Sequence, residues 1–530
     1  MLSFDAARNL LIYETAQQGA ILGHIPQARA VGNHHVAVPR NLWNIQVLRQ
    51  LGLPVVGLID ANYPWPRAPG ITPLEHQRVM ANFLVSHPHC FNLSDMGTMK
   101  TLSTLWACDW LMRQHKEGEC RALIVAPLSI LDRVWGRTIF ENFLGKRSFR
   151  IIHGSPAKRE RELAAPADFY VINFDGLGVG SSTAKGRLQL GGLSAALQSR
   201  SDIRIVVIDE ASAYRDSRTR RHKLAKLLFK QREYLWLLTG TPTPNGPFDA
   251  FGLAKLVNDA NGESFHSFYH RTMTRLSMWK WVPRQNAHLE VRKLLQPAIR
   301  YDIKDVWDGP PLTTQQRHVD LTKEQVAHMR KLKSQMQTEL SSGVKITPVN
   351  EAAMRMKFIQ ISLGAVYDST HASHGIDASP RVKALHEVIE QTDGKVLILA
   401  PLTNVVKMLY RELEEYPREV VNGETSPKER TRIFNAFQSD ESPRLLIADP
   451  GVLAHGLDLW RAKIVCWYGP TDKVEQYLQA NKRAHRPGQR YPVTVVQLTS
   501  TATEREIFRR IANQENLQGV LLNMVKSEQF

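Results

Sequence analysis

Short apolar runs alternate with longer amphipathic stretches in two parts of the chain. The first part, about 71–260, has five such runs, at 91–93, 122–126, 170–172, 203–208 and 234–238. The second part begins at about 376 and has four, at 395–400, 444–448, 463–468 and 493–498. Buried strands that alternate with helix-length segments form parallel sheets flanked by helices. The pattern therefore predicts an α/β protein with two parallel sheets.

The segments outside these two parts have a different pattern. Between 261 and 375 the strand signal fades, and 321–340 and 350–364 have helical patterning. Near the start, 63–70 holds three prolines and a glycine, which marks a boundary. We therefore expect four segments: a small N-terminal α+β module at 1–68, a first lobe at 69–262, a helical insert with a linker at 263–375, and a second lobe at 376–530.

The composition is that of a soluble globular protein. Hydrophobic residues make up 43% and charged residues 22% of the 530. No apolar run approaches the roughly 20 residues that a membrane span needs, so we expect no membrane partner. Asp5 and Glu14 interrupt the apolar N-terminus, which lacks a signal-peptide pattern and favours the cytoplasm, or a nucleus in a eukaryotic host. The four cysteines form no C-x-x-C pair and are expected to be buried free thiols.

The charge balance favours a polyanionic partner. Lys and Arg number 68 against 51 Asp and Glu, a net charge of +17. Basic side chains displace counterions from nucleic-acid phosphates, so such an excess is typical of nucleic-acid binding. Two runs, at 214–230 and 265–300, each hold seven basic residues and one acidic residue. Solvated helix faces remain the alternative for either run.

The segment SDMGTMKT, from Ser94 to Thr101, has the context of a phosphate-binding loop. It follows an apolar strand and opens a helical run, so the backbone amides of Gly97, Thr98 and Met99 would face phosphate. Lys100 would reach the β- and γ-phosphates of ATP, and the Thr101 hydroxyl would ligate Mg²⁺. A turn of no functional importance is the alternative.

Two further segments end apolar strands. In VVIDEAS, Asp209 would hold Mg²⁺ and Glu210 would orient the attacking water. In LLTGTPTPNG, the turn after the strand would sense the nucleotide through Thr239 and Thr241. Carboxyl ends of parallel strands lie at one sheet edge, so we expect both segments beside the phosphate loop. Ordinary acids and a tight turn are the alternatives.

The segment QANKRAHRPGQ holds two arginines three residues apart. Arg483 and Arg486 would lie on one face if the segment is helical. Arginines presented to the nucleotide stabilise charge in phosphoryl transfer, which makes both candidate catalytic residues. A basic helix end at the surface is the alternative.

The four segments SDMGTMKT, VVIDEAS, LLTGTPTPNG and QANKRAHRPGQ follow one another along the chain in this order. Together they resemble the motifs of superfamily-two helicases, and specifically those of the Swi/Snf family of DNA translocases. The segment ITPLEHQ is similar to the family's adenine-recognising motif, which carries Gln77 over as an adenine contact. ADPGVLAHGLDLW is similar to a motif of its second lobe, which carries over Gly456 and Asp458 as nucleotide contacts. ALIVAPLSILDRVW, the linker region at 296–325 and RAHRPGQRYPVTVVQLTSTATEREIFRRI extend the resemblance to about 71–512.

The resemblance implies two RecA-like lobes that close on ATP and Mg²⁺. It predicts an ATP-dependent translocase on double-stranded or branched DNA that remodels, anneals or branch-migrates it, acting as a monomer. Residues 21–54 also resemble the HepA-related module of annealing helicases, which would make the N-terminal segment a DNA-recognition module. A protein-docking module or a structural cap remains the alternative for that segment.

The chain departs from the family pattern in places that leave other functions open. Met99 stands where the phosphate loop usually has glycine, and Ser212 stands where a histidine usually follows DEA. Either change would weaken hydrolysis and favour an ATP-gated clamp on nucleic acid or protein. A helicase that acts on RNA or separates strands is the other alternative. Trp279 and Trp281 would either stack on exposed bases or pack within the protein.

Overall fold

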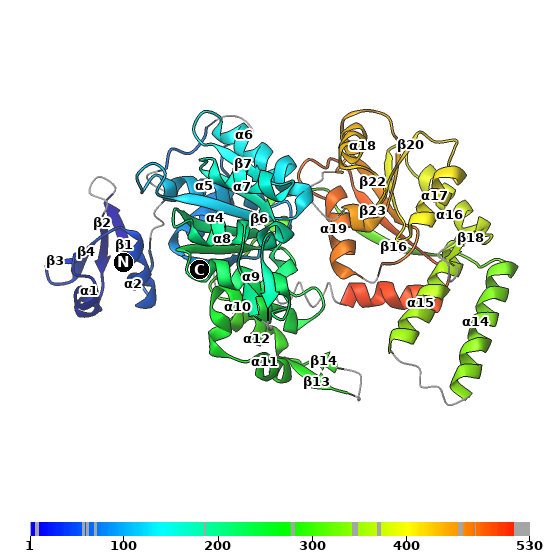
Figure 1. Ribbon diagram of the computed structural model, residues 1–530, viewed down its shortest axis with the longest axis horizontal. Helices are drawn as coiled ribbons and strands as arrows, with labels where there is room; N and C mark the ends of the chain where they lie inside the picture. Colours follow the sequence, from blue (N-terminus) through cyan, green and yellow to red (C-terminus); the bar gives the residue numbers. More distant parts are fainter. Residues whose placement is uncertain are drawn as a thin grey trace. The chain divides into compact units, whose positions relative to one another are not determined.

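The structure, a computed structural model, divides into two compact units, which meet in sequence between Val306 and Trp307. It describes residues 2–5, 10–55, 59, 63–67, 72–184, 187–276, 281–341, 348–367, 373–453, 459–471 and 473–513. Within these ranges, no helix combines the length and apolar character that crossing a membrane requires. Figure 1 labels the helices and strands of both units.

The N-terminal module is a four-stranded antiparallel sheet with two helices. Its strand order is β1-β2-β4-β3, so it contains more strands than the sequence pattern indicates. Its elements are β1 (Leu2–Asp5), β2 (Leu10–Glu14), α1 (Gln18–His24), β3 (Arg29–Val31), β4 (His35–Pro39) and α2 (Leu42–Gln50). The Asn41 side chain caps α2 by accepting from the amide of Asn44, which fixes where the helix begins.

The module packs directly on the first lobe. Arg49 of α2 contacts the ring of His87, which follows α4 (Glu75–Ser86). Burial, together with the neighbouring Arg49, lowers the pKa of His87 to about 3. Buried apolar residues of the module, such as Leu11 and Ile45, belong to the same hydrophobic cluster as Leu84 of α4. The two parts therefore share one core.

The first lobe contains a parallel seven-stranded sheet of order β15-β5-β12-β11-β6-β8-β7. The five strands that the sequence predicts occupy its interior, and β15 and β7 are its edges. The strands are β5 (His89–Asn92), β6 (Arg121–Ala126), β7 (Phe149–Ile152), β8 (Phe169–Asn173), β11 (Ile203–Asp209), β12 (Tyr234–Leu238) and β15 (Ala298–Ile299). Because the interior strands are covered on both faces, they are almost entirely apolar.

Helices surround this sheet, and a small subdomain extends the unit. The helices next to the sheet include α5 (Lys100–Met112), α6 (Arg137–Phe143), α7 (Pro156–Ala164), α8 (Leu193–Ser199), α9 (Arg220–Phe229) and α10 (Ala250–Val257). The subdomain consists of α11 (Phe265–Thr272), α12 (Ala287–Leu294) and a hairpin of β13 (Met273–Arg275) and β14 (Trp281–Pro283), which lie together in Figure 1. The unit ends in the single turn α13 (Ile303–Val306).

The second unit contains a parallel six-stranded sheet of order β16-β23-β22-β19-β21-β20. All four strands that the sequence predicts for this lobe are present, and β16 and β20 complete the edges. The strands are β16 (Leu312–His318), β19 (Lys395–Leu399), β20 (Arg418–Val421), β21 (Leu445–Ala448), β22 (Ala462–Trp467) and β23 (Val493–Thr499). The α/β fold with two parallel sheets is therefore confirmed.

The helices of the second unit include a projecting pair. They are α14 (Lys323–Ser341), α15 (Pro348–Leu363), α16 (Ser379–Glu390), α17 (Thr403–Glu412), α18 (Pro427–Ser439) and α19 (Val474–Ala484), with a hairpin of β17 (Ala365–Tyr367) and β18 (Ser373–Gly375). Figure 1 shows α14 and α15 side by side. The elements of the expected insert thus fall partly in the first unit and partly in the second. The division into four segments stays a prediction.

Candidate functional site

Neighbouring strands of the first sheet carry the predicted nucleotide segments to one edge. The phosphate-loop segment follows β5, the Thr239 turn follows β12, and the acidic pair ends β11. In the sheet these strands are consecutive, in the order β5-β12-β11, and all run parallel. Their carboxyl ends therefore meet at the same edge, where open α/β sheets bind ligands. The topology brings together Lys100 and Thr239, which are 139 residues apart in the chain.

The loop after β5 has the backbone of a phosphate cradle. Gly97 has φ 88° and Met99 has φ 59°, both in the left-handed region, and α5 begins directly at Lys100. The Lys100 ammonium donates to the carbonyl oxygens of Ser94, at 2.5 Å, and Asp95, at 3.1 Å. The Thr98 hydroxyl also donates to Asp95, at 2.8 Å. The loop is thus closed on itself around the lysine, at the start of a 13-residue helix.

The acidic pair lies at the end of β11 with a fixed orientation. One oxygen of Asp209 accepts from the Glu210 amide at 3.0 Å, and the other accepts from the indole N–H of Trp135 at 3.0 Å. Glu210 has φ 50°, so the chain turns sharply there. Trp135 is fully buried and belongs to a π-helical turn, η2 (Leu131–Gly136), that follows β6. The sequence analysis did not identify Trp135 as a site residue.

The turn after β12 approaches the phosphate loop closely. A Cβ atom on Gly240 would lie 3.4 Å from both the amide nitrogen of Met96 and the carbonyl oxygen of Ser94. The buried hydroxyl of Thr239 accepts from the amide of Thr241 at 3.1 Å, which tightens the turn. A Cβ atom at position 240 would therefore be in van der Waals contact with the loop. The structure therefore places Thr239 beside the loop that holds Lys100.

Gln77 has an amide group suited to a ligand. It lies in the first turn of α4 and is 1% exposed. Its oxygen accepts from the Leu74 amide at 2.9 Å, while its nitrogen has no hydrogen-bond partner among the described residues. The preceding His76 approaches the carbonyl of Thr98 at 3.2 Å, and burial lowers the pKa of its imidazole. A buried donor without a partner costs free energy, so this nitrogen fits an acceptor on a bound base.

In the second unit the arginine segment is only partly helical. Arg483 lies in α19 and is buried, whereas α19 ends at Ala484 and Arg486 follows in a turn. His485 at the helix end is extended, with φ −106° and ψ 90°. The two arginines therefore do not share one helical face, because the helix stops between them. Gly456 and Asp458 fall in 454–458, outside the described residues.

The basic runs are largely engaged by acidic residues of the chain itself. In the run at 214–230, Arg218 pairs with Asp216, Arg221 with Asp175 and Lys226 with Asp259. In the hairpin, the Trp281 ring packs 5.2 Å from Tyr269 and 5.3 Å from His270. This contact favours the packing interpretation for Trp281, and Trp279 lies outside the described residues. The four cysteines are buried and free, as expected.

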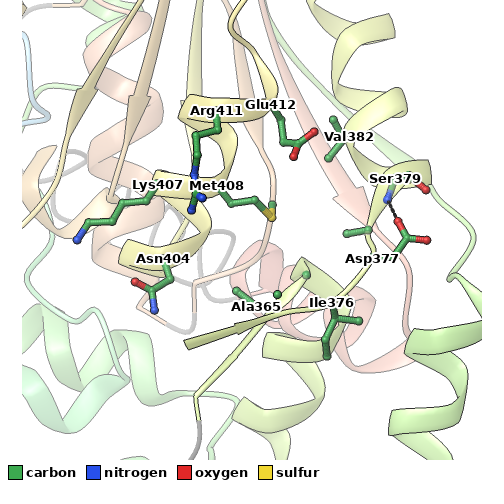
Figure 2. Close-up of a pocket in the computed structure, with 13 residues that line it drawn as sticks. Ala365, Ile376, Asp377, Ser379, Val382, Asn404, Lys407, Met408, Arg411 and Glu412 are labelled. Carbon is green, nitrogen blue, oxygen red and sulfur yellow. Dashed lines mark hydrogen bonds between the residues drawn. The ribbon is translucent and has the colours of Figure 1, made fainter. Parts of the chain in front are cut away.

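A cavity of about 570 Å³ opens in the second unit, between α17, the start of α16 and the β17–β18 hairpin. Figure 2 shows Asn404, Lys407, Met408 and Arg411 on one helix along its wall, across from Ile376. Lys407 also pairs with Glu424, at 2.8 Å. None of the predicted site residues is among the described residues that line this cavity. It is therefore distinct from the nucleotide segments.

Comparisons with known protein families and with similar proteins agree on one family. The SNF2-related domain matches residues 76–363, more than half of the chain, and the helicase conserved C-terminal domain matches residues 380–488. The putative protein p41 of Acyrthosiphon pisum secondary endosymbiont phage 1 is 24% identical, over 86% of this chain and 99% of its own length.

Larger eukaryotic proteins match over part of their length. The Xenopus laevis SWI/SNF-related matrix-associated actin-dependent regulator of chromatin subfamily A-like protein 1 is 23% identical, over 81% of this chain and 42% of its own length. Protein CHROMATIN REMODELING 5 of Arabidopsis thaliana is 24% identical, over 86% of this chain and 27% of its own length. The chain thus spans less than half of either eukaryotic relative.

A solved structure, the Sulfolobus solfataricus SWI2/SNF2 ATPase core in complex with double-stranded DNA, is 20% identical with a TM-score of 0.37. The match covers 86% of this chain and 93% of that one. The two family matches cover most of both units and include every predicted nucleotide segment in order. The chain belongs to the SNF2-related family of helicase-like, DNA-dependent ATPases.

Proposed function

We propose that this protein uses ATP hydrolysis to move along double-stranded DNA and thereby remodels, anneals or branch-migrates it. The observation that carries the proposal is the convergence of the Lys100 loop, the Asp209–Glu210 pair and the Thr239 turn on three consecutive parallel strands. Such a sheet edge can hold a triphosphate, orient water and respond to phosphate loss in one place.

In this proposal each residue has one task in ATP hydrolysis. Gln77 donates its buried amide N–H to adenine, and the amides at 97–101 bind phosphate oxygens. Lys100 exchanges its two carbonyl acceptors for the β- and γ-phosphates. Thr101 and Asp209 would hold Mg²⁺, which supplies positive charge to the phosphates. Glu210 orients the attacking water, and Thr239 responds to the γ-phosphate.

The second unit would complete the chemistry with positive charge. Arg483 and Arg486 stabilise the phosphoryl-transfer transition state, for which arginines are worth about 10³–10⁵ in rate. Gly456 and Asp458 add nucleotide contacts from the same unit. Arg483 is buried and Arg486 half-buried, so we expect unequal contributions, with Arg486 the more accessible of the two.

Double-stranded DNA is the proposed track for two reasons. The family couples hydrolysis to DNA, and the chain carries a net charge of +17. A translocating motor must bind every sequence that it passes, so its contacts should be mainly to phosphate. Binding of this kind is electrostatic and independent of sequence.

The decisive experiment measures steady-state ATP hydrolysis alone and with duplex, forked and single-stranded DNA and with RNA. We expect strong stimulation by duplex or forked DNA, abolished by Lys100→Ala and by Glu210→Gln. Displacement of a triplex-forming strand from the duplex, without unwinding of the duplex itself, would establish translocation.

Other outcomes would select another function. Tight ATP binding without turnover would replace the motor with an ATP-gated clamp, as the Met99 and Ser212 departures suggest. Preferential stimulation by RNA would make the protein an RNA-dependent motor, and unwinding of the duplex would make it a strand-separating helicase. Each result excludes the translocase as we state it.

The N-terminal module is proposed to recognise the DNA substrate. Trp43 on α2 is 52% exposed, and Arg29 and Val31 on the edge strand β3 are exposed beside open solvent. An exposed aromatic ring can stack on unpaired bases, and an exposed arginine can contact phosphate, so both suit unpaired or branched DNA. Trp43→Ala should lower stimulation by forked DNA more than stimulation by linear duplex. An equal loss on both substrates would contradict this role.

A further inference from the structure

A buried arginine joins the phosphate loop to the chain that leaves the first unit. Arg300 follows the edge strand β15 and is 3% exposed. Its guanidinium donates to the carbonyl of Leu93 at 2.5 Å, to the carboxylate of Asp95 at 3.3 Å, and to the carboxylate of Asp302. Leu93 and Asp95 lie at the start of the loop, and Asp302 lies four residues before the unit ends.

Backbone hydrogen bonds join the same two segments. The Asp95 amide donates to the carbonyl of Tyr301 at 2.9 Å, and the Ile303 amide donates to the Asp95 carboxylate at 3.3 Å. The amide of Tyr301 donates to the hydroxyl of Ser94 at 3.1 Å. Ser94 occupies the position at which phosphate loops usually have their first glycine, so its hydroxyl provides a contact that glycine lacks.

These contacts bear directly on the catalytic lysine. Lys100 is held by the carbonyl oxygens of Ser94 and Asp95, the two residues that the 300–303 segment grips. Asp95 and Asp302 are both buried, and a buried carboxylate needs a cation or several donors nearby. Arg300 supplies that cation to both and also fixes the carbonyl just before the loop. Its removal would leave two buried negative charges facing each other.

We propose that Arg300 is a positioning residue for the nucleotide site. It sets the path of residues 93–95, and through their carbonyls it sets the position from which Lys100 reaches phosphate. Because residues 300–303 are hydrogen-bonded to residues 93–95, a displacement of the loop would also displace this segment of the linker. This inference rests on the proposed function only in assuming that the loop binds ATP.

The test compares ATP binding by Arg300→Met with that by Arg159→Met, using a fluorescent ATP analogue without DNA. Arg159 is a matched control, because it is also buried in the first unit and its guanidinium bonds the Gly154 carbonyl, the Ile152 carbonyl and Asn173. Its partners lie near β7 and β8, away from the loop. Both variants should lower the melting temperature, and Arg300→Met alone should raise the Kd for the analogue, by about tenfold or more.

A double variant separates positioning from stability. In Arg300→Met/Asp302→Asn one of the two facing charges is removed, so the melting temperature should recover in part. The hydrogen bonds from Arg300 to Leu93 and Asp95 are still missing in this double variant, so the Kd for the analogue should remain raised. Recovery of the Kd in step with the melting temperature, or an equal rise in Arg159→Met, would overturn the proposal. Wild-type hydrolysis with duplex DNA tests the motor separately, and its failure would leave this binding comparison intact.

Discussion

The strained residues of the first unit include two in its nucleotide segments. Among the described residues, five other than glycine have positive φ, and Met99 and Glu210 are two of them. A left-handed conformation costs an ordinary residue about 1–2 kcal/mol, and such strain gathers at functional sites. The family's usual glycine at position 99 avoids that cost. The loop of this chain therefore places a left-handed backbone on a residue that disfavours it.

Restoring glycine at this position should make the loop more favourable for ATP. Met99 is 45% exposed, so Met99→Gly removes strain and bulk with little lost packing. The relief of strain is offset by about 0.5–1 kcal/mol of chain entropy, so we expect a net gain in unfolding free energy of about 0–1.5 kcal/mol. The KM for ATP should fall, as measured by steady-state hydrolysis. Asn261→Gly, at another positive φ, is the control that should leave the KM unchanged; a higher KM in Met99→Gly would contradict the argument.

At the scale of elements, the π-helical turn η2 ties the carboxylate of Asp209, the proposed Mg²⁺ ligand, to the segment after β6. The indole N–H of Trp135, which lies in this turn, donates to the Asp209 carboxylate at 3.0 Å, and π-helical turns are frequent at functional sites. Trp135→Phe removes the N–H and keeps an aromatic ring. We expect kcat to fall by about tenfold, as for other partners of metal ligands.

The control for this prediction is a second buried indole of the same sheet. Trp236 on β12 is fully buried and donates to the carbonyl of His87 at 3.1 Å, away from the acidic pair. Trp236→Phe should cost similar stability and leave kcat and its dependence on magnesium concentration nearly unchanged. If both variants lose kcat equally, the Trp135 contact has no role beyond packing.

The elements that could be predicted from sequence are those buried on both faces. β12 reads as YLWLL and is wholly buried, so its apolar run is unambiguous. β16, with the sequence LTTQQRH, is mostly exposed, and only its pairing with β23, some 180 residues later, makes it a strand. The edge strands β7 and β20 were missed for the same reason. A run of apolar residues in the sequence indicates a buried strand, and these three edge strands are less buried than the interior strands.

Some residues of the candidate site could also be predicted from the sequence, and others could not. Lys100, Asp209 and Thr239 could be found because each follows an apolar strand within its own short segment. Trp135 and Arg300 could not, because their partners lie 74 and 205 residues away in sequence, and only the fold brings them together. A common face for Arg483 and Arg486 depended on a helix through both residues, and α19 ends between them, which spacing alone does not reveal.

For the whole molecule, the net charge of +17 matters more than any one basic run. The helix α9 has the densest cluster of basic residues, yet several of these side chains pair with acidic residues nearby. Charges paired within the protein release fewer counterions when DNA binds, because they are already neutralised. The proposed attraction to DNA phosphates therefore cannot be assigned to the α9 cluster alone.

The salt dependence of DNA binding tests this view. The logarithm of the association constant for duplex DNA should fall linearly with the logarithm of salt concentration. If six or more phosphates are contacted, affinity should drop by about 10³ or more between about 50 and 200 mM salt, with a smaller slope for a single strand. Duplexes of equal length and different sequence should give the same line, because phosphate contacts carry no sequence information. Weak salt dependence, or affinities that differ strongly between sequences, would mean that base contacts hold the DNA, and a motor held in that way could not advance along an arbitrary duplex.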